Sequence, residues 1–325
     1  MARRTARIAQ RCWLLALLCA LACGVAVGAP SGNGAQPTPR HAAIERGLPR
    51  FDATRLAALR RAADGGNADS QRVLGYLHLF GRGVARDPAL GYRWLLSAAK
   101  GGDVRAQYEV ALAYRNGRTL PRDVAKGNAW MTRAAEAGSA EAQTALGAIH
   151  RRGSGVRADP RVAAEWYRKA VAQGSPDAMT NLAWMLHAGD GVANDPAQAF
   201  ALMRSAADAG RPKAQYALGT FHATGVGTKA DPSAAMAAFL AAARGGHVRA
   251  QFEVARRYLA GDGVVVDPVR AWLWRTIAER SLAPAVPRQA PALAARFSAA
   301  QRASSAALLA QCTRAGLASC DLPPG

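Results

Sequence analysis

Large and small apolar residues recur along this chain with a fixed period of 36 residues. A large aliphatic residue returns at every step, at Leu74, Val110, Leu146, Leu182, Leu218 and Val254. The next position is always small, at Gly75, Ala111, Gly147, Ala183, Gly219 and Ala255. A second small position follows, at Gly91, Gly127, Ala163, Ala199, Ala235 and Ala271. Six copies without an insertion predict a repeat array, and the paired small positions predict two helices that cross closely in each copy.

Glycine and aspartate mark the ends of these helices. The first helix of a copy, helix A, follows Gly66 or its equivalent, where Asn67, Asp103, Ser139 and Ser175 suit the N-cap. Helix A ends at a glycine suited to the left-handed conformation, at Gly81, Gly117, Gly153, Gly189, Gly225 and Gly261. The second helix, helix B, begins at an aspartate, usually before proline, at Asp87, Asp123, Asp159, Asp195, Asp231 and Asp267.

The repeat "LGYLHLFGRGVARDPALGYRWLLSAAKGG", residues 74–102, resembles the Sel-one-like repeat family, a relative of tetratricopeptide repeats. The shared features are the LG pair, an aromatic residue soon after it, GxGV, an aspartate, then tryptophan and two alanines before glycine. The resemblance implies an all-α fold, a right-handed α-solenoid of six 36-residue helix-turn-helix repeats. It also implies a protein-interaction adaptor, often in bacterial envelopes or among secreted regulators.

The chain departs from the family pattern at a few positions. Thr119 replaces a loop glycine, Leu202 and Ala238 replace the helix-B tryptophan, and Arg275 and Glu279 stand at apolar or small places. These departures put local packing in doubt and leave the predicted fold unchanged. Cysteine-rich secreted members carry a disulfide in each repeat, and this chain has none there, so their activities are not transferred to it.

The segments flanking the array complete the predicted organisation. We expect a signal peptide at 1–28, a flexible linker at 29–50 and an N-terminal half repeat at 51–65. The six repeats occupy 66–281, and a C-terminal cap and tail occupy 282–325. Ser298 and Gln301 form a capping-box pattern that predicts a closing helix from about 299 to 313, because the end of a solenoid needs a cap.

The first 28 residues have the layout of a secretory signal. Four arginines precede an apolar run from Trp13 to Ala22, and small residues follow up to a cleavage position after Gly28. We therefore expect a periplasmic or secreted protein without a transmembrane span in the mature chain. A lipoprotein anchored at Cys23 is the alternative.

The formal net charge of +20 becomes +16 once the four signal arginines are removed. Such a charge favours acidic protein partners or anionic envelope polymers, whereas nucleic acid is not expected as a partner of an exported protein. The alternative is compositional: arginine is common throughout, and the basic residues are spread along the sequence rather than clustered.

Two cysteines remain in the mature chain, Cys312 and Cys320. In an oxidising compartment an even pair predicts one disulfide, which would close a short C-terminal loop; free thiols are the alternative. The tail offers too few ligands for a metal site, and no metal or other cofactor is expected.

The sequence contains no recognisable catalytic motif. His78, His150 and His222 share one repeat position with Tyr114 and Tyr258, which indicates packing positions with a polar tip. The repeated aspartates are explained by helix capping. We therefore predict that the protein is not an enzyme; an envelope hydrolase is the weakest alternative.

The predicted binding surface lies on helix A. Counting 100° per residue, three positions in each copy point away from the core stripe, and in a solenoid of this family that face lines the concave groove. The predicted partner-binding residues are Arg72, Tyr76, Tyr108, Arg115, Arg151, Trp184, His187, Tyr216, Phe252 and Arg256. Aromatic and arginine side chains dominate interface energetics, and aromatic residues exposed here would serve binding; the alternative is that they pack against the neighbouring repeat.

These observations predict an exported adaptor or scaffold that binds a partner protein, with a role in envelope regulation or signalling. The expected ligand is an extended acidic segment, with arginines pairing carboxylates and aromatics stacking on the chain. The alternative is a binder of peptidoglycan or another anionic envelope polymer.

Overall fold

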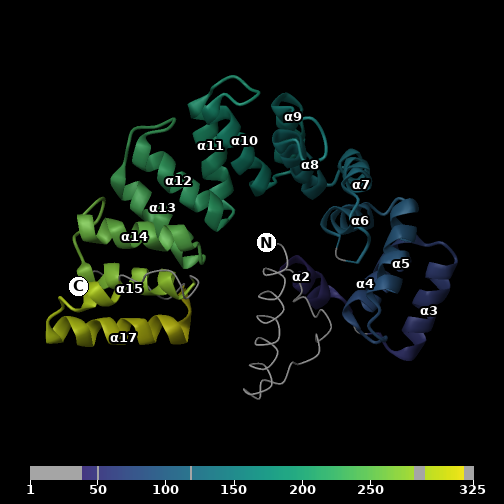
Figure 1. The fold of residues 1–325 in the computed structure, drawn as a ribbon, viewed down its shortest axis with the longest axis horizontal. Helices are drawn as coiled ribbons and strands as arrows, with labels where there is room; N and C mark the ends of the chain where they lie inside the picture. Colours follow the sequence, from purple (N-terminus) through teal and green to yellow (C-terminus); the bar gives the residue numbers. More distant parts are fainter. Residues whose placement is uncertain (1–38, 50, 118, 282–289, 318–325) are drawn as a thin grey trace, which may run out of the picture. The chain divides into compact units, whose positions relative to one another are not determined.

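The computed structural model describes residues 39–49, 51–117, 119–281 and 290–317. Every regular element within these ranges is a helix (Figure 1). The chain divides into two compact units, residues 1–49 and 50–325. In the first unit the described element is α2 (Pro39–Gly47), and the second unit contains the repeat array.

The array consists of alternating A and B helices of 13 residues each. The A helices are α4 (Ala68–Phe80), α6 (Val104–Asn116), α8 (Ala140–Arg152), α10 (Pro176–Ala188), α12 (Pro212–Thr224) and α14 (Val248–Ala260). The B helices are α5 (Pro88–Lys100), α7 (Val124–Glu136), α9 (Pro160–Ala172), α11 (Pro196–Asp208), α13 (Pro232–Arg244) and α15 (Pro268–Arg280). Each helix packs on the next one along the chain. The prediction of an α-solenoid with six helix-turn-helix copies is confirmed.

The helix ends form as the sequence predicts. The carboxylate of Asp87 accepts a hydrogen bond from the amide of Leu90 at 2.9 Å, and the equivalent aspartates cap the other B helices. Gly81 has φ 72°, and its five equivalents end the remaining A helices in the same left-handed conformation. Arg211 makes no side-chain cap, so α12 begins with Pro212 alone.

The small positions fit the size of the residue that faces them. A Cβ atom added to Gly219 would lie 2.7 Å from the ring of Phe239, and one added to Gly147 would lie 2.7 Å from the ring of Tyr167. In copy 1 the two glycines meet directly, since a Cβ on Gly91 would lie 2.8 Å from the carbonyl oxygen of Gly75. Close crossing is thus confirmed there, whereas in copies 3 and 5 the space admits an aromatic ring.

A glutamine, buried in four cases and half-buried at Gln215, joins a helix to the next A helix at five of the six junctions. Its side-chain amide donates to a carbonyl oxygen near the end of the preceding helix, at 3.0–3.5 Å. The pairs are Gln71 with Ala63, Gln107 with Ala99, Gln143 with Ala135, Gln215 with Ala207 and Gln251 with Ala243. Met179 occupies this position in copy 4. The glutamines follow the 36-residue period, yet their acceptors become evident only in the folded chain.

The two flanks of the array differ from the sequence expectation in detail. Part of the segment predicted to be a flexible linker forms α2, which begins at Pro39 and continues through helix-forming alanines. The half repeat forms α3 (Ala53–Asp64). The predicted signal peptide, including Cys23, lies outside the described residues.

Within residues 290–317, the described part of the C-terminal cap, the structure has two helices where one was predicted. The closing helix is α17 (Ala299–Ala315), and both halves of the capping box of Ser298 and Gln301 are present. A short helix, α16 (Ala290–Ala294), precedes it. Cys312 is buried against the last repeat, but Cys320 lies outside the described residues, and the disulfide stays a prediction.

Candidate functional site

The predicted groove positions occupy one face of the A helices, which we call the A face. It comprises Arg72, Tyr76 and Leu79 on α4 and their equivalents on α6, α8, α10, α12 and α14. Most of these side chains are half-buried, and in copy 6 Arg256 and Leu259 are exposed. The expectation of exposed aromatic side chains is wrong for Tyr76, which is only 3% exposed. The other predicted aromatic side chains of this face are half-buried rather than exposed. Counting residues on a single helix leaves out the neighbours that cover part of each ring.

Aromatic contacts run across the A face of copies 4 to 6. The ring of Trp184 on α10 meets Phe221 on α12 edge-on, with 5.1 Å between centroids, and His187 lies 5.5 Å from the same Phe221. Tyr216 on α12 stacks on His247, which caps α14, at 4.6 Å. These contacts therefore join adjacent copies, and every ring except the buried Phe221 keeps part of its surface in solvent.

Phe252 on α14 and Tyr76 on α4 have cationic neighbours. The guanidinium of Arg275 lies 5.4 Å from the ring centroid of Phe252. Tyr76 stacks on Phe80 at 6.2 Å, and the guanidinium of Arg72 lies 5.9 Å from its ring. Tyr108 on α6 is half-buried. Each of these rings has a packing role within the chain.

The arginines of the A face bind polar groups of the chain itself. Arg72 donates to Asp103 of the next copy at 2.9 Å and also pairs with Asp69. Burial opposes the charge of Arg72, but the hydrogen bond and the charge of Asp103 outweigh it, and the pKa of Arg72 is raised. The predicted availability of this guanidinium for a partner carboxylate is therefore reduced.

Arg115 and Arg151 make the same bond in successive copies, each reaching the loop after the next A helix. Arg115 donates to the hydroxyl of Ser154 at 3.0 Å, and Arg151 donates to the carboxylate of Asp190 at 3.0 Å. Arg115 also contacts Asn128. These bonds tie neighbouring loops together, a role that their position on one helix did not reveal.

Copy 6 holds a network of ions around Arg256 and Arg257. Arg256 pairs with Glu253 at 2.7 Å and with Asp262 at 3.3 Å. Arg257, which is buried, binds the same two carboxylates and lies over the ring of Phe239. The hydrogen bond from Arg256 is the main cause that lowers the pKa of Glu253, in spite of burial. The network holds α14 against α13.

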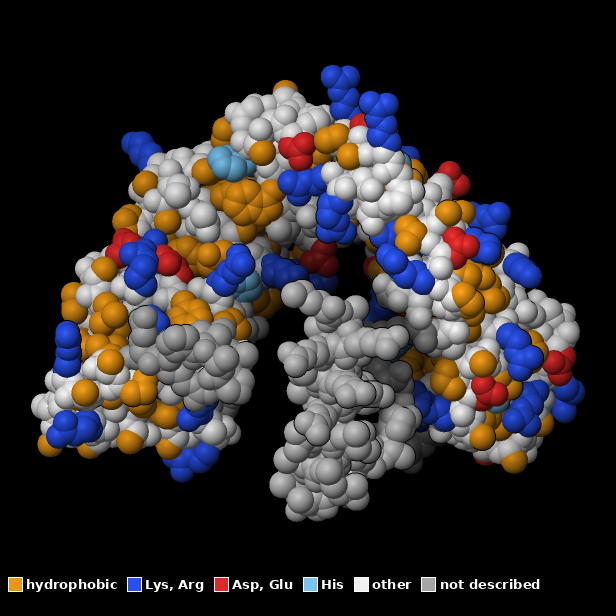
Figure 2. Space-filling view, viewed as in Figure 1, with side chains coloured by type: hydrophobic (Ala, Val, Ile, Leu, Met, Phe, Trp, Pro, Cys, Tyr) orange, Lys and Arg blue, Asp and Glu red, His pale blue; other side chains and the backbone are white. Residues whose placement is uncertain are grey.

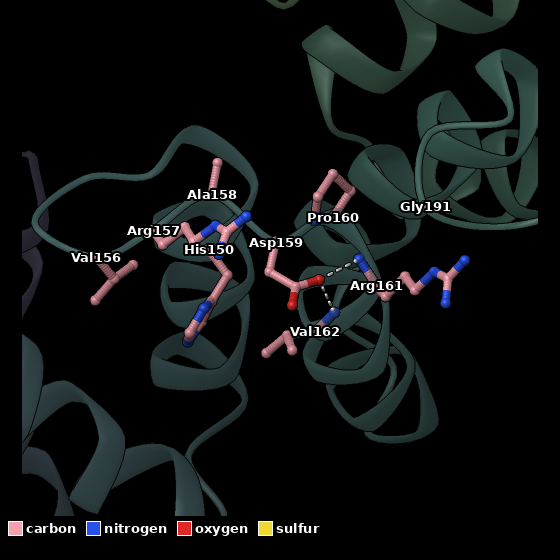
Figure 3. A pocket seen from close by; sticks show the side chains of 9 residues that line it. All are labelled: His150, Val156, Arg157, Ala158, Asp159, Pro160, Arg161, Val162 and Gly191. Carbon is pink, nitrogen blue, oxygen red and sulfur yellow. Dashed lines mark hydrogen bonds between the residues drawn. The ribbon is translucent and has the colours of Figure 1, made fainter.

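A pocket of about 580 Å³ lies at the edge formed by the loops that connect helix A to helix B, in the same loops that Arg115 and Arg151 of the A face reach. It is lined by His150, Val156, Arg157 and the start of α9, with Gly191 from the next copy. Figure 3 shows Asp159 between His150 and Arg157 on one side and Arg161 on the other. Asp159 accepts from the amides of Arg161 and Val162, which assigns one of its oxygens to the helix cap.

No group of three or more potential metal ligands occurs in the part of the chain that the structure describes. Within the same ranges, no helix combines the length and the apolar character needed to cross a membrane. The surface in Figure 2 carries many more Lys and Arg side chains than Asp and Glu side chains. The arrangement offers surfaces for binding along the A face and at the loop edge.

The comparison with protein families gives matches in every copy. The Sel1 repeat model matches residues 68–103, 104–139, 140–175, 176–210, 212–247 and 248–274. No curated protein shows a significant match to the sequence.

Solved structures of similar proteins share the repeat. A Sel1 repeat protein from Oxalobacter formigenes is 26% identical, with a TM-score of 0.63, and the match covers 70% of this chain and 100% of that one. The protective antigen c5321 from uropathogenic Escherichia coli, described as displaying an SLR fold, is 27% identical, with a TM-score of 0.49. The match covers 81% of this chain and 64% of that one.

Proposed function

This chain belongs to the Sel1 repeat family, and we propose that it is an exported scaffold that binds an extended segment of a partner protein along the A face. The family provides a scaffold fold for protein interactions and is generally non-catalytic. The observation that carries the proposal is the row of half-buried rings across copies 4 to 6, including Trp184, His187 and Tyr216. Rings that are rigid and partly solvated provide contact area at a low cost in conformational entropy.

The partner segment is acidic in this proposal. Arg151 and Arg256 of the A face have 35% and 56% of their side-chain surface exposed. Their own carboxylate partners are also partly solvated. An incoming carboxylate can therefore share or replace Asp190 or Asp262 without burying an unpaired charge.

A photo-crosslinking residue tests the location of the binding surface. We would place it at Leu259, which lies on the A face and is 44% exposed, and at Ala237, an exposed control position on α13. One partner crosslinked in cells from position 259 and not from position 237 is the expected result. Crosslinks to that partner from position 237 alone would refute the assignment to the A face.

A matched pair of substitutions tests the acidic character of the partner. Thr220 is half-buried on the A face, and its hydroxyl binds only the carbonyl of Tyr216 in its own helix. Thr220→Glu should lower the crosslinking yield from position 259, whereas Thr220→Lys, which loses the same hydrogen bond, should maintain or raise it. Equal yields from the two variants would contradict an acidic ligand.

Export rests on the arginines and the apolar run at the N-terminus. N-terminal sequencing of the protein recovered from the periplasm or medium should find a chain that begins at Ala29. A chain that begins at a lipid-modified Cys23 would establish the lipoprotein alternative, and a full-length cytoplasmic chain would contradict export.

A further inference from the structure

The basic residues are concentrated in the first half of the array. Copies 1 to 3, residues 66–173, contain 17 Lys and Arg against 9 Asp and Glu, a net charge of +8. Copies 4 and 5, residues 174–245, contain five of each, a net charge of zero. The expectation that basic residues are evenly spread is therefore wrong at the scale of the repeats, and compositional bias alone does not predict such a difference between copies of one repeat.

Part of this excess gathers at the loop edge of copies 2 and 3, which we call the basic edge: Arg122, Arg152, Arg157 and Arg161. All four side chains are exposed. None of them has a carboxylate within ion-pair distance among the residues that the structure describes, whereas Arg72, Arg151 and Arg256 of the A face each have one. Figure 2 shows blue side chains gathered over α8 and α9.

Neighbouring charges on the basic edge repel one another. The pKa of Arg115, which lies beside the edge, is lowered by burial and then by the charges of Arg152 and Arg122. Like charges held together without a counterion raise the local positive potential. An anionic ligand would relieve this repulsion.

The pocket beside α9 provides an apolar cavity next to these charged side chains. Val156, Pro160 and Val162 supply apolar walls, while Arg157 and Arg161 lie at its margins (Figure 3). Val156 is 36% exposed, so its apolar surface is open to a ligand. The carboxylate of Asp159 is engaged by two backbone amides at the start of α9, which reduces its effect on an incoming anion.

We propose that the basic edge, with this pocket, is a second docking surface that binds an acidic peptide segment carrying one apolar side chain. The carboxylates pair with Arg152, Arg157 and Arg161, and the apolar side chain enters the pocket against Val156 and Val162. A peptide fits this surface because it can supply carboxylates for the arginines together with a large apolar side chain for the apolar walls. Arg115 and Arg151 of the A face reach the same loops. The proposal uses no A-face residue, however, and does not depend on the function proposed there.

The test uses the full chain and a fluorescein-labelled peptide with one leucine at its centre and three glutamates on each side of it. Fluorescence anisotropy should show binding that weakens with salt. Replacing the leucine by serine should weaken binding because the pocket loses its occupant, and replacing the glutamates by glutamine should abolish it.

Two triple variants distinguish an effect of the basic edge on peptide binding from an effect of the net charge of the protein. Arg152→Gln/Arg157→Gln/Arg161→Gln should weaken peptide binding about tenfold, the combined effect of three exposed ion pairs. Arg93→Gln/Arg105→Gln/Arg204→Gln removes the same charge at exposed positions elsewhere and should leave affinity nearly unchanged.

Three results would overturn the proposal. They are absence of peptide binding to the unmodified chain, equal losses in both triple variants, and a serine peptide that binds as tightly as the leucine peptide. A different result would assign the basic edge to an anionic polymer instead. In that case the unmodified chain would not bind the peptide but would sediment with purified cell-wall sacculi, and the first triple variant would no longer do so. Thr220→Glu should leave peptide binding intact, so this test and the A-face test fail independently.

Discussion

His247 links the stability of one helix to the A face. Its Nδ1 accepts a hydrogen bond from the amide of Ala250 at 3.2 Å, while its ring stacks on Tyr216. Only a neutral imidazole can accept this bond. Burial, followed by the charges of Arg249 and Lys213, lowers the pKa of His247 below its ordinary value of 6.5, so the neutral form is favoured in the folded chain.

This arrangement predicts a pH dependence. Because the folded-state pKa is lowered, the unfolded chain binds the proton more readily, and the contribution to stability is present above about pH 6.5 and lost as pH falls through the folded pKa. Lowering the pH from 7.5 to 5.5 should reduce the free energy of unfolding of copy 6 by up to about 1 kcal/mol, the contribution of an N-cap. His247→Asn retains a capping side chain and should show a smaller change, measured by hydrogen exchange of α14. An identical pH response in the two proteins would show that His247 is not responsible.

The helix pairs show how the size of one residue depends on its partner across the hairpin. Copies 3 and 5 place glycine on helix A opposite the rings of Tyr167 and Phe239, while copies 2 and 4 carry alanine at that position and Met131 or Met203 as the buried helix-B residue. In copies 2 to 5 a smaller residue on helix A therefore goes with a larger one on helix B, whereas copy 1 pairs Gly75 with Leu95.

A double-mutant cycle at copy 5 tests this relation. Gly219→Ala should lower the free energy of unfolding by about 1–2 kcal/mol, since overpacking against Phe239 outweighs the gain in helix propensity. In the Phe239→Met background the same change should be neutral or stabilising, because alanine with methionine is the pair found in copy 4. Thermal or urea unfolding of the four proteins measures the coupling, and additive effects would contradict it.

Interactions within one helix could be predicted from the sequence, whereas those between copies could not. Asp87 and Gly81 act on neighbouring backbone groups, so their residue type and spacing are sufficient. The position of Tyr76 on its helix did not reveal its burial, and the bond from Arg151 to Asp190 requires the next hairpin to be in place. The predicted residues accordingly share one helix face, but their side chains are less exposed than expected.

At the scale of the whole molecule, the last repeat is modified to end the array. Glu279 stands where earlier copies have alanine or valine, and it is 3% exposed. It pairs with Arg275 at 2.9 Å and accepts the amide of Ala290, the first residue of α16, at 3.3 Å. The two residues that depart most from the repeat pattern thus fasten the C-terminal cap.

Glu279→Ala should loosen this cap. It leaves Arg275 without its partner and the amide of Ala290 without its acceptor, at a local cost of about 3 kcal/mol. Hydrogen exchange should accelerate in α15 to α17, while α4 to α9 remain protected because solenoid repeats contact only their neighbours. Glu165→Ala, at an exposed position on α9, is the control. Uniform acceleration along the array would contradict a local capping role.

The run of glutamines is interrupted at one junction, between α9 and α10, where Met179 in the first turn of α10 takes their place. A methionine side chain donates no hydrogen bond to the carbonyl before it. The same junction divides the basic first half of the array from the neutral copies that follow. When a partner attached to one half is pulled away from the other, this junction has to bear the tension without a glutamine bond, through the packing of α9 on α10 and the bond from Arg151 to Asp190.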